Sequence, residues 1–123
     1  MTESSWDETI ILDCDHLSGF TGGDPDFECE VLDIFLSNAP DYLETLCNSE
    51  SERWRVTAHK LKGAARSIGA WRLARSAERA ERMAAPKPGD PRRVAILKDL
   101  GERLAALVEF IRDYQIELRN SAV

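Results

Sequence analysis

Hydrophobic residues recur every three or four positions along most of the chain, which is the spacing of one face of an α-helix. The clearest case follows Asp90-Pro91, an N-cap acid and a proline suited to the first helical position. Its apolar stripe consists of Leu97, Leu100, Leu104, Leu107, Ile111, Tyr114 and Leu118. Because the stripe is unbroken, we expect one helix that is buried along one side against other helices.

A second helix is expected after Asp24-Pro25, which is a start signal of the same kind. Pro40 falls inside this segment and is expected to kink the helix or split it in two. The apolar residues of the segment, taken as one face, are Phe27, Val31, Ile34, Phe35, Ala39, Leu43 and Leu46. A small helix is expected before it, around Leu17 and Phe20 and ahead of the turn Thr21-Gly22-Gly23.

Two more helices are expected in the centre of the chain. Ser49-Glu50-Ser51-Glu52 has capping-box spacing, and Gly69 suits the left-handed residue that ends a helix. The apolar stripe between them is Trp54, Ala58, Leu61, Ala65 and Ile68. The next helix directs Leu73, Ala77, Ala80 and Ala84 inward. It is followed by Ala-Pro-Lys-Pro-Gly at residues 85–89, a cluster of helix breakers that predicts a loop.

Four amphipathic helices joined by short connections predict an all-α fold, an antiparallel four-helix bundle with a short extra N-terminal helix. No repeat, low-complexity tract or internal boundary interrupts the 123 residues. We therefore interpret residues 1–123 as a single domain, with residues 1–10 as a loosely ordered N-terminal segment.

The charges are distributed unevenly. Residues 1–52 hold 14 of the 22 acidic residues and no Lys or Arg, whereas residues 53–123 hold all 16 basic residues. One interpretation is a basic half that binds nucleic acid. We favour the other, in which the acidic half packs beside the basic half, because the charges follow helical patterns and form no basic tail. We expect no nucleic-acid partner.

The composition is typical of a soluble cytoplasmic protein. No apolar run approaches the roughly 20 residues that cross a bilayer, so we expect no membrane association. The first residues are acidic, unlike the basic start of a signal peptide. The three cysteines cannot all pair with one another, which favours a reducing compartment.

His59 is the main candidate for chemistry. At about 100° per residue, its side chain lies about 140° from the centre of its helix's apolar stripe and should point into solvent. Position alone leaves an ordinary surface histidine equally open. The neighbours on its face are Arg55, Lys62, Gly63 and Arg66. A glycine here costs about 1 kcal/mol of helix stability, and one reason to accept that cost is close approach by another molecule.

Residues 59–73, HKLKGAARSIGAWRL, resemble the signature of histidine phosphotransfer (HPt) domains. That signature is a histidine followed by Leu-Lys-Gly, a small pair and a second glycine. The resemblance extends to the earlier half of the chain, through Leu12-Asp13, Thr21-Gly22-Gly23-Asp24, Phe27, Glu30, Phe35-Leu36 and Ala39-Pro40. It implies a helical domain containing a four-helix bundle, in agreement with the hydrophobic pattern.

The resemblance also implies a role in a phosphorelay. His59 would accept a phosphoryl group from the aspartyl phosphate of a receiver (response-regulator) domain and pass it reversibly to another receiver. Lys62 would be the cation near the phosphoryl oxygens, and Gly63 the clearance residue. The expected partners are receiver domains and a hybrid histidine kinase, and the chain is expected to be a monomer.

No cofactor is expected on the chain itself, because the resemblance places any Mg²⁺ on the carboxylates of the partner receiver. The fragment Cys14-x-His16 lacks the further pair of ligands that a metal site needs, so we predict no metal site.

A docking surface is predicted from helix geometry. If the two central helices form an antiparallel hairpin about Gly69, His59 lies at the level of the region near Arg79. Arg75 and Arg79, with Arg55 and Arg66, would then attract an acidic receiver. The alternative is a solvated face of weak ion pairs.

Two enzymatic interpretations are excluded. The chain has neither a G-x-x-x-x-G-K-[ST] nor a G-x-G-x-x-G phosphate-binding loop, so we predict a phosphocarrier without ATP-dependent kinase activity. The dimerisation helices of sensor kinases usually place an acid directly after the histidine, whereas Lys60 stands here. The remaining alternative is a helical docking module that binds or inhibits a receiver or histidine kinase without carrying phosphate.

Overall fold

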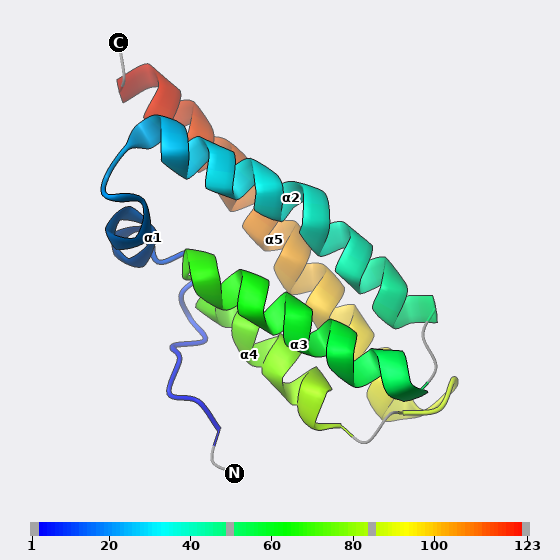
Figure 1. Ribbon diagram of the computed structural model, residues 1–123. Helices are drawn as coiled ribbons and strands as arrows, with labels where there is room; N and C mark the ends of the chain where they lie inside the picture. Colours follow the sequence, from blue (N-terminus) through cyan, green and yellow to red (C-terminus); the bar gives the residue numbers. More distant parts are fainter. Residues whose placement is uncertain (1–2, 49–50, 84–85, 122–123) are drawn as a thin grey trace.

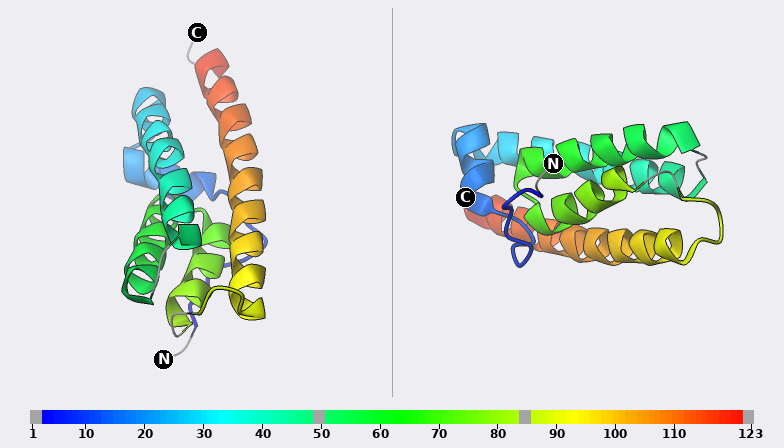
Figure 2. Two further views of the ribbon diagram at one scale, coloured as in Figure 1. Left: turned by 90° about the vertical axis from the view of Figure 1, so that its right-hand side faces the viewer. Right: turned by 90° about the horizontal axis from the view of Figure 1, so that it is seen from below.

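The computed structural model describes residues 3–48, 51–83 and 86–121. Over these residues the chain forms five helices and no strand: α1 (Cys14–Thr21), α2 (Pro25–Asn48), α3 (Ser51–Ile68), α4 (Trp71–Arg82) and α5 (Pro91–Ser121). Helix α2 packs on α3 and α5, and α4 packs on the same two helices, so the four form a bundle (Figure 1). Helix α1 lies across one end of it (Figure 2). The predicted all-α bundle with a short extra N-terminal helix is confirmed.

The core is formed by the stripes that the hydrophobic pattern predicts for α3, α4 and α5. All five stripe residues of α3 are at most 2% exposed, and Leu73, Ala77 and Ala80 of α4 are equally buried. Leu100, Leu104, Leu107 and Ile111 supply the α5 side. Burying these side chains is the main favourable contribution to folding. Ala84, Ala85, Ser49 and Glu50, which also carried predictions, lie outside the described residues.

Helix α2 differs from the prediction in two respects. It continues through the exposed Pro40, so of the two predicted effects, a kink or a split, the split is excluded. Its single predicted apolar face is in fact two. Leu32, Phe35, Ala39 and Leu46 point into the core, whereas Phe27 and Ile34 are 43% and 61% exposed. At about 100° per residue, Phe27 and Ile34 lie together on a second stripe of the helix.

The connection between α3 and α4 is tightly fixed. Gly69 ends α3 with a left-handed φ of +81°, as predicted, and the Ala70 amide donates to the Ala65 carbonyl at 2.9 Å. The amide of Asp13 donates to the Gly69 carbonyl at 2.8 Å. At the other end of α4, the buried indole of Trp54 donates through Nε1 to the Ala80 carbonyl at 2.7 Å. Both ends of α4 are therefore held against α3.

The N-terminal segment, residues 3–10, was expected to be loosely ordered, but it packs along α4 in the structure (Figure 2). Its acidic side chains form ion pairs with arginines: Glu3 with Arg75, and Glu8 with Arg79 and Arg103. These pairs confirm the interpretation that the acidic half of the chain packs beside the basic half. None of the described helices is long and apolar enough to cross a membrane.

Candidate functional site

His59 lies on the outer side of α3, and its side chain is 67% exposed. The residues that anchor the helix, such as Trp54 and Leu61, are fully buried on the opposite side. This separation follows from the helical period, since residues that differ by about half a turn face opposite directions. The predicted outward direction of the ring is confirmed.

One carboxylate holds both His59 and Lys62. The Nδ1 atom of His59 lies 2.9 Å from Oε1 of Glu81 on α4, and the Lys62 Nζ lies 2.6 Å from Oε2 of the same group. Because an ionised carboxylate only accepts hydrogen bonds, this contact places the ring proton on Nδ1. The Nε2 atom then carries the free lone pair, and no residue that the structure describes is bonded to it.

The environment of Glu81 keeps it ionised. Its side chain is only 16% exposed, and this burial by itself raises the pKa of the carboxyl group. The hydrogen bonds from Lys62 and His59 act in the opposite direction and prevail, so the pKa of Glu81 lies below its ordinary value. The carboxylate is therefore charged at neutral pH and accepts from both Lys62 and His59 without a proton of its own.

The helix surface beside the ring is open. A Cβ atom added at Gly63 would meet nothing within 4 Å, apart from its own helix. One turn further along, Ser67 donates through Oγ to the Gly63 carbonyl at 2.8 Å, so the backbone at the glycine keeps a hydrogen-bond partner. No packing contact therefore requires a glycine at position 63, and the surface beside His59 is open there.

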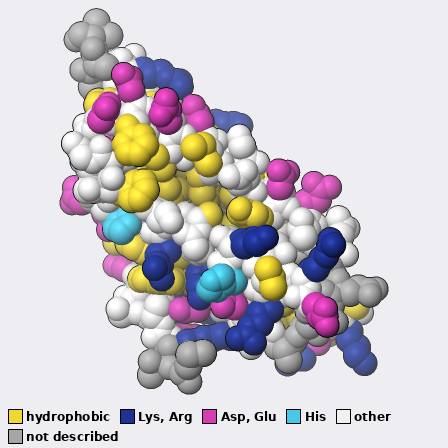
Figure 3. Space-filling model, in the orientation of Figure 1, with side chains coloured by type: hydrophobic (Ala, Val, Ile, Leu, Met, Phe, Trp, Pro, Cys, Tyr) yellow, Lys and Arg dark blue, Asp and Glu magenta, His cyan; other side chains and the backbone are white. Residues whose placement is uncertain are grey.

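Exposed apolar side chains form a patch, which we call the α1–α2 patch: Phe20, Phe27 and Ile34, between 43% and 61% exposed. The rings of Phe20 and Phe27 stack with centroids 6.4 Å apart. Figure 3 shows hydrophobic side chains gathered over α1 and α2 on the same face that displays both histidines. Val56, one turn before His59 on α3, is also 55% exposed. Exposed apolar clusters of this kind mark surfaces that bind other proteins.

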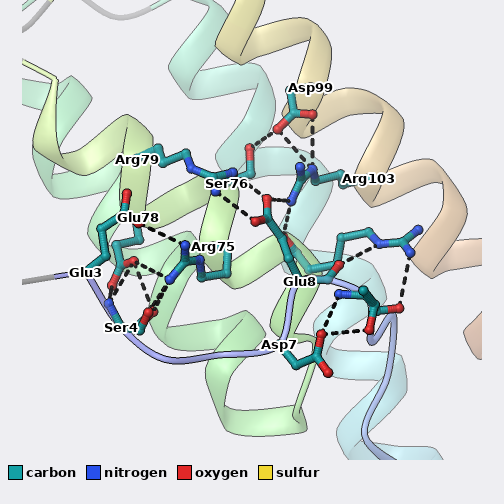
Figure 4. Close-up of polar contacts among 12 residues, drawn as sticks. Glu3, Ser4, Asp7, Glu8, Arg75, Ser76, Glu78, Arg79, Asp99 and Arg103 are labelled. Atoms are coloured by element: carbon teal, nitrogen blue, oxygen red, sulfur yellow. Dashed lines mark hydrogen bonds and ion pairs between the residues drawn. The ribbon is translucent and has the colours of Figure 1, made fainter.

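Of the four predicted docking residues, Arg55 and Arg66 are exposed on α3 near His59, and neither forms an ion pair with a residue that the structure describes. Arg75 and Arg79 have different contacts. Both point toward the N-terminal segment (Figure 4), where Arg75 binds Glu3 and the Ser4 carbonyl, and Arg79 binds Glu8. Their guanidinium groups are therefore engaged within the chain, and their role in docking stays a prediction.

Glu81 and the α1–α2 patch were both missed in the sequence. The hairpin argument pointed to the region near Arg79, which includes Glu81, but it considered only the arginines there. For the patch, the signal was present as the apolar residues Phe20, Phe27 and Ile34, but the pattern could not separate the exposed stripe of α2 from the buried one.

The other histidine has structural contacts. The His16 ring packs edge-on against Trp71, with centroids 4.9 Å apart, and the Cys14 thiol lies 3.9 Å from the Leu12 carbonyl. Within residues 3–48, 51–83 and 86–121, no three His, Cys, Asp or Glu side chains gather as they would to hold a metal ion.

Chemically, the His59 cluster is suited to accept an electrophilic anion. A neutral imidazole whose Nδ1 proton is held by a carboxylate offers Nε2 as a nucleophile, and the adjacent ammonium offsets negative charge that arrives there. The exposed ring, with no side chain on Gly63, leaves room for a second macromolecule to bring that anion.

Comparison with known families agrees with this chemistry. A family model described as Hpt domain matches residues 30–110, which include α3, α4 and most of α2 and α5. No curated protein and no solved structure matches the chain.

Proposed function

Because the chain belongs to the Hpt domain family, we propose that it is a phosphorelay intermediate in which His59 carries the phosphoryl group. Hpt domains are phosphocarriers that work with receiver domains and kinases. The observation that supports the assignment of His59 is its contact with Glu81, which holds the Nδ1 proton and leaves the exposed Nε2 free.

The Nε2 lone pair attacks the phosphorus of a receiver's aspartyl phosphate, and the bond between phosphorus and the aspartate oxygen breaks, which returns the electron pair to that carboxylate. The ring then carries a positive charge, because the Nδ1 proton stays in place against Glu81. In the reverse direction a receiver aspartate attacks the phosphorus, and the electrons of the N–P bond return to Nε2.

The neighbouring residues have distinct roles in this proposal. Lys62 places an ammonium one helical turn from the phosphorylated ring, where it offsets the charge of the phosphoryl oxygens. Gly63 leaves the space that the receiver's active site needs. The chain itself requires no cofactor, and any Mg²⁺ is held by the carboxylates of the receiver.

The receiver would dock on the face that bears His59. The α1–α2 patch and Val56 offer apolar contact area, and Arg55 and Arg66 add positive charge close to the ring. This combination suits a receiver whose acidic active site is surrounded by apolar side chains, because apolar burial supplies affinity and the charges guide the approach.

The test is to incubate the protein with a receiver domain that carries a radiolabelled aspartyl phosphate. The wild type should acquire a phosphate that is labile in acid and stable in alkali, as expected for phosphohistidine. His59→Gln should acquire none. The matched control is His16→Gln, which removes the other exposed histidine and should be labelled like the wild type.

Label that persists in His59→Gln would disprove the assignment of the site. If the wild type binds the receiver but takes up no phosphate, the chain is instead a docking module that binds a receiver without carrying phosphate, and the proposal fails.

A further inference from the structure

Helix α4, which carries Glu81, is poorly stabilised by its own sequence. It is only 12 residues long, its N-cap Ala70 makes no side-chain capping bond, and its first turn has no acidic residue. It also carries Arg72, Arg75, Arg79 and Arg82 at spacings of three and four, which brings like charges together on the helix surface. A helix of this length and charge pattern needs stabilisation from outside itself.

The N-terminal segment supplies many of the missing partners. The Ile10 carbonyl accepts from the amide of Arg72 in the first turn of α4, at 3.0 Å. The Arg72 side chain donates to the carbonyls of Glu8 and Thr9, at 3.0 and 3.1 Å. Further along the helix, the backbone and side chain of Ser4 both donate to the buried Glu78. These contacts fix the segment, which turns at residues 8 and 9, along α4 from Arg72 to Arg79.

Glu8 connects the N-terminal segment to two helices, α4 and α5. Its carboxylate binds Arg79 through both oxygens, and Oε1 also lies 2.7 Å from Nη1 of Arg103 on α5 (Figure 4). The same Arg103 donates to the Arg72 carbonyl at 2.9 Å and to Asp99 at 3.0 Å. One side chain of the N-terminal segment therefore joins α4 to α5.

We propose that residues 3–10 act as a brace that holds α4 where Glu81 must stand, with Glu8 as a positioning residue for phosphotransfer at His59. Arg79 lies two residues before Glu81 on the same short helix, so a constraint on Arg79 limits the movement of Glu81. The brace lies outside residues 30–110, which match the family model, and is thus a feature that family membership does not supply. The inference rests on the proposed function of His59.

The test compares Glu8→Gln with Asp7→Asn in the full chain. Both variants remove one acidic charge from the N-terminal segment, but the Asp7 carboxylate contacts only Thr9, two residues away. In Glu8→Gln, hydrogen exchange of the α4 amides should accelerate about tenfold, because charge-assisted hydrogen bonds to two arginines are weakened. Exchange in α2 should change far less, and Asp7→Asn should leave α4 unaffected.

The functional measurement separates chemistry from binding. Glu8→Gln should lower the transfer rate at saturating receiver several-fold. It should not raise the receiver concentration needed for half-saturation, because Glu8 binds Arg79 and Arg103 and none of the residues of the proposed docking face. Nitrogen NMR of His59 should also show the Nδ1-protonated form as the sole tautomer in the wild type and a mixture of both tautomers in Glu8→Gln.

If hydrogen exchange of the α4 amides is unchanged in Glu8→Gln, the proposal that residues 3–10 brace α4 is wrong. Accelerated exchange with an unchanged transfer rate and an unchanged His59 tautomer would show that the segment is only structural, and would overturn the positioning role. If the wild type accepts no phosphoryl group at all, the function of His59 fails, and the exchange and tautomer measurements still decide whether the brace positions Glu81.

Discussion

The protein contains two clusters built on the same plan, and they differ in what they can do. In the first, Glu81 bridges His59 and Lys62 between α3 and α4. In the second, Glu8 bridges Arg79 and Arg103 between α4 and α5. Each consists of one carboxylate and two nitrogen-bearing side chains, which lie on α3 in the first cluster and on α4 and α5 in the second. Each carboxylate connects α4 with a neighbouring part of the molecule.

The two clusters differ in the side chains that the carboxylate binds. A guanidinium is charged at every accessible pH, and its nitrogens only donate, so the Glu8 cluster has no nucleophile and can only hold. An imidazole held at one nitrogen still has a lone pair on the other, and the His59 ring is 67% exposed. A bridging carboxylate therefore has two different outcomes. Glu8 only connects helices, which we call the mechanical cluster, whereas Glu81 holds an imidazole that can react, which we call the reactive cluster.

Removing the bridge from the reactive cluster should give the largest effect. In Glu81→Ala the His59 ring loses its orientation and Lys62 its partner, so we expect the transfer rate from a phosphorylated receiver to fall about 100-fold. The measurement is single-turnover transfer at saturating receiver. The parallel variant Glu8→Ala should lower the rate much less.

Equal losses in the two variants would contradict the distinction between a reactive cluster and a mechanical one. Thermal unfolding of both variants serves as the control, since a variant that is largely unfolded at the assay temperature cannot be compared.

The sequence predicted what depends on local periodicity. The stripe Trp54, Ala58, Leu61, Ala65 and Ile68 is one face of a helix, so its burial and the outward direction of His59 both follow from counting residues. Gly69 was predictable for a similar reason, because few residues other than glycine end a helix in the left-handed conformation.

What the sequence did not predict depends on contacts between distant segments. Glu81 meets His59 only because the α3–α4 hairpin has one particular register, and the hairpin argument reached the region near Arg79 without selecting one residue in it. Residues 3–10 have no periodic pattern, and their order comes from arginines more than 60 residues away. On α2, the apolar Ile34 carries no local mark that distinguishes it from the buried Phe35.

A side chain at Gly63 should separate stability from function. Nothing lies within 4 Å of a Cβ atom at this position, so Gly63→Leu should fit the fold and stabilise α3 by up to about 1 kcal/mol through helix propensity. The same side chain would stand one turn from His59 and obstruct the receiver, so we expect transfer to slow about tenfold. Urea unfolding and single-turnover transfer measure the two effects, and a variant that transfers as fast as the wild type would show that clearance is not the role of Gly63.

The Glu8 cluster should make the free energy of unfolding depend on pH in acid. This is the smallest of the three expected effects. The hydrogen bond from Arg79 lowers the pKa of Glu8 to about 2, against the opposing effect of burial and with further help from Arg103. Because this pKa is depressed in the folded state, the stabilisation is fully present above the ordinary value of 4.5 and is lost as the pH falls from there through about 2. The Glu8 side chain is 32% exposed and solvent screens its pairs, so we expect a loss of about 1 kcal/mol.

Urea unfolding of the wild type and of Glu8→Gln at pH 6 and at pH 2.5 isolates this contribution. The wild type should be more stable than the variant by about 1 kcal/mol at pH 6. Most of that difference should disappear at pH 2.5, because Glu8 is protonated in the unfolded chain at that pH and must lose its proton on folding to keep its ion pairs. Asp7→Asn is the control, since Asp7 forms no bond to another helix. A stability difference that stayed constant between the two pH values would mean that Glu8 acts through packing and not through its charge, and the likeness between the two carboxylate bridges would then be only geometric.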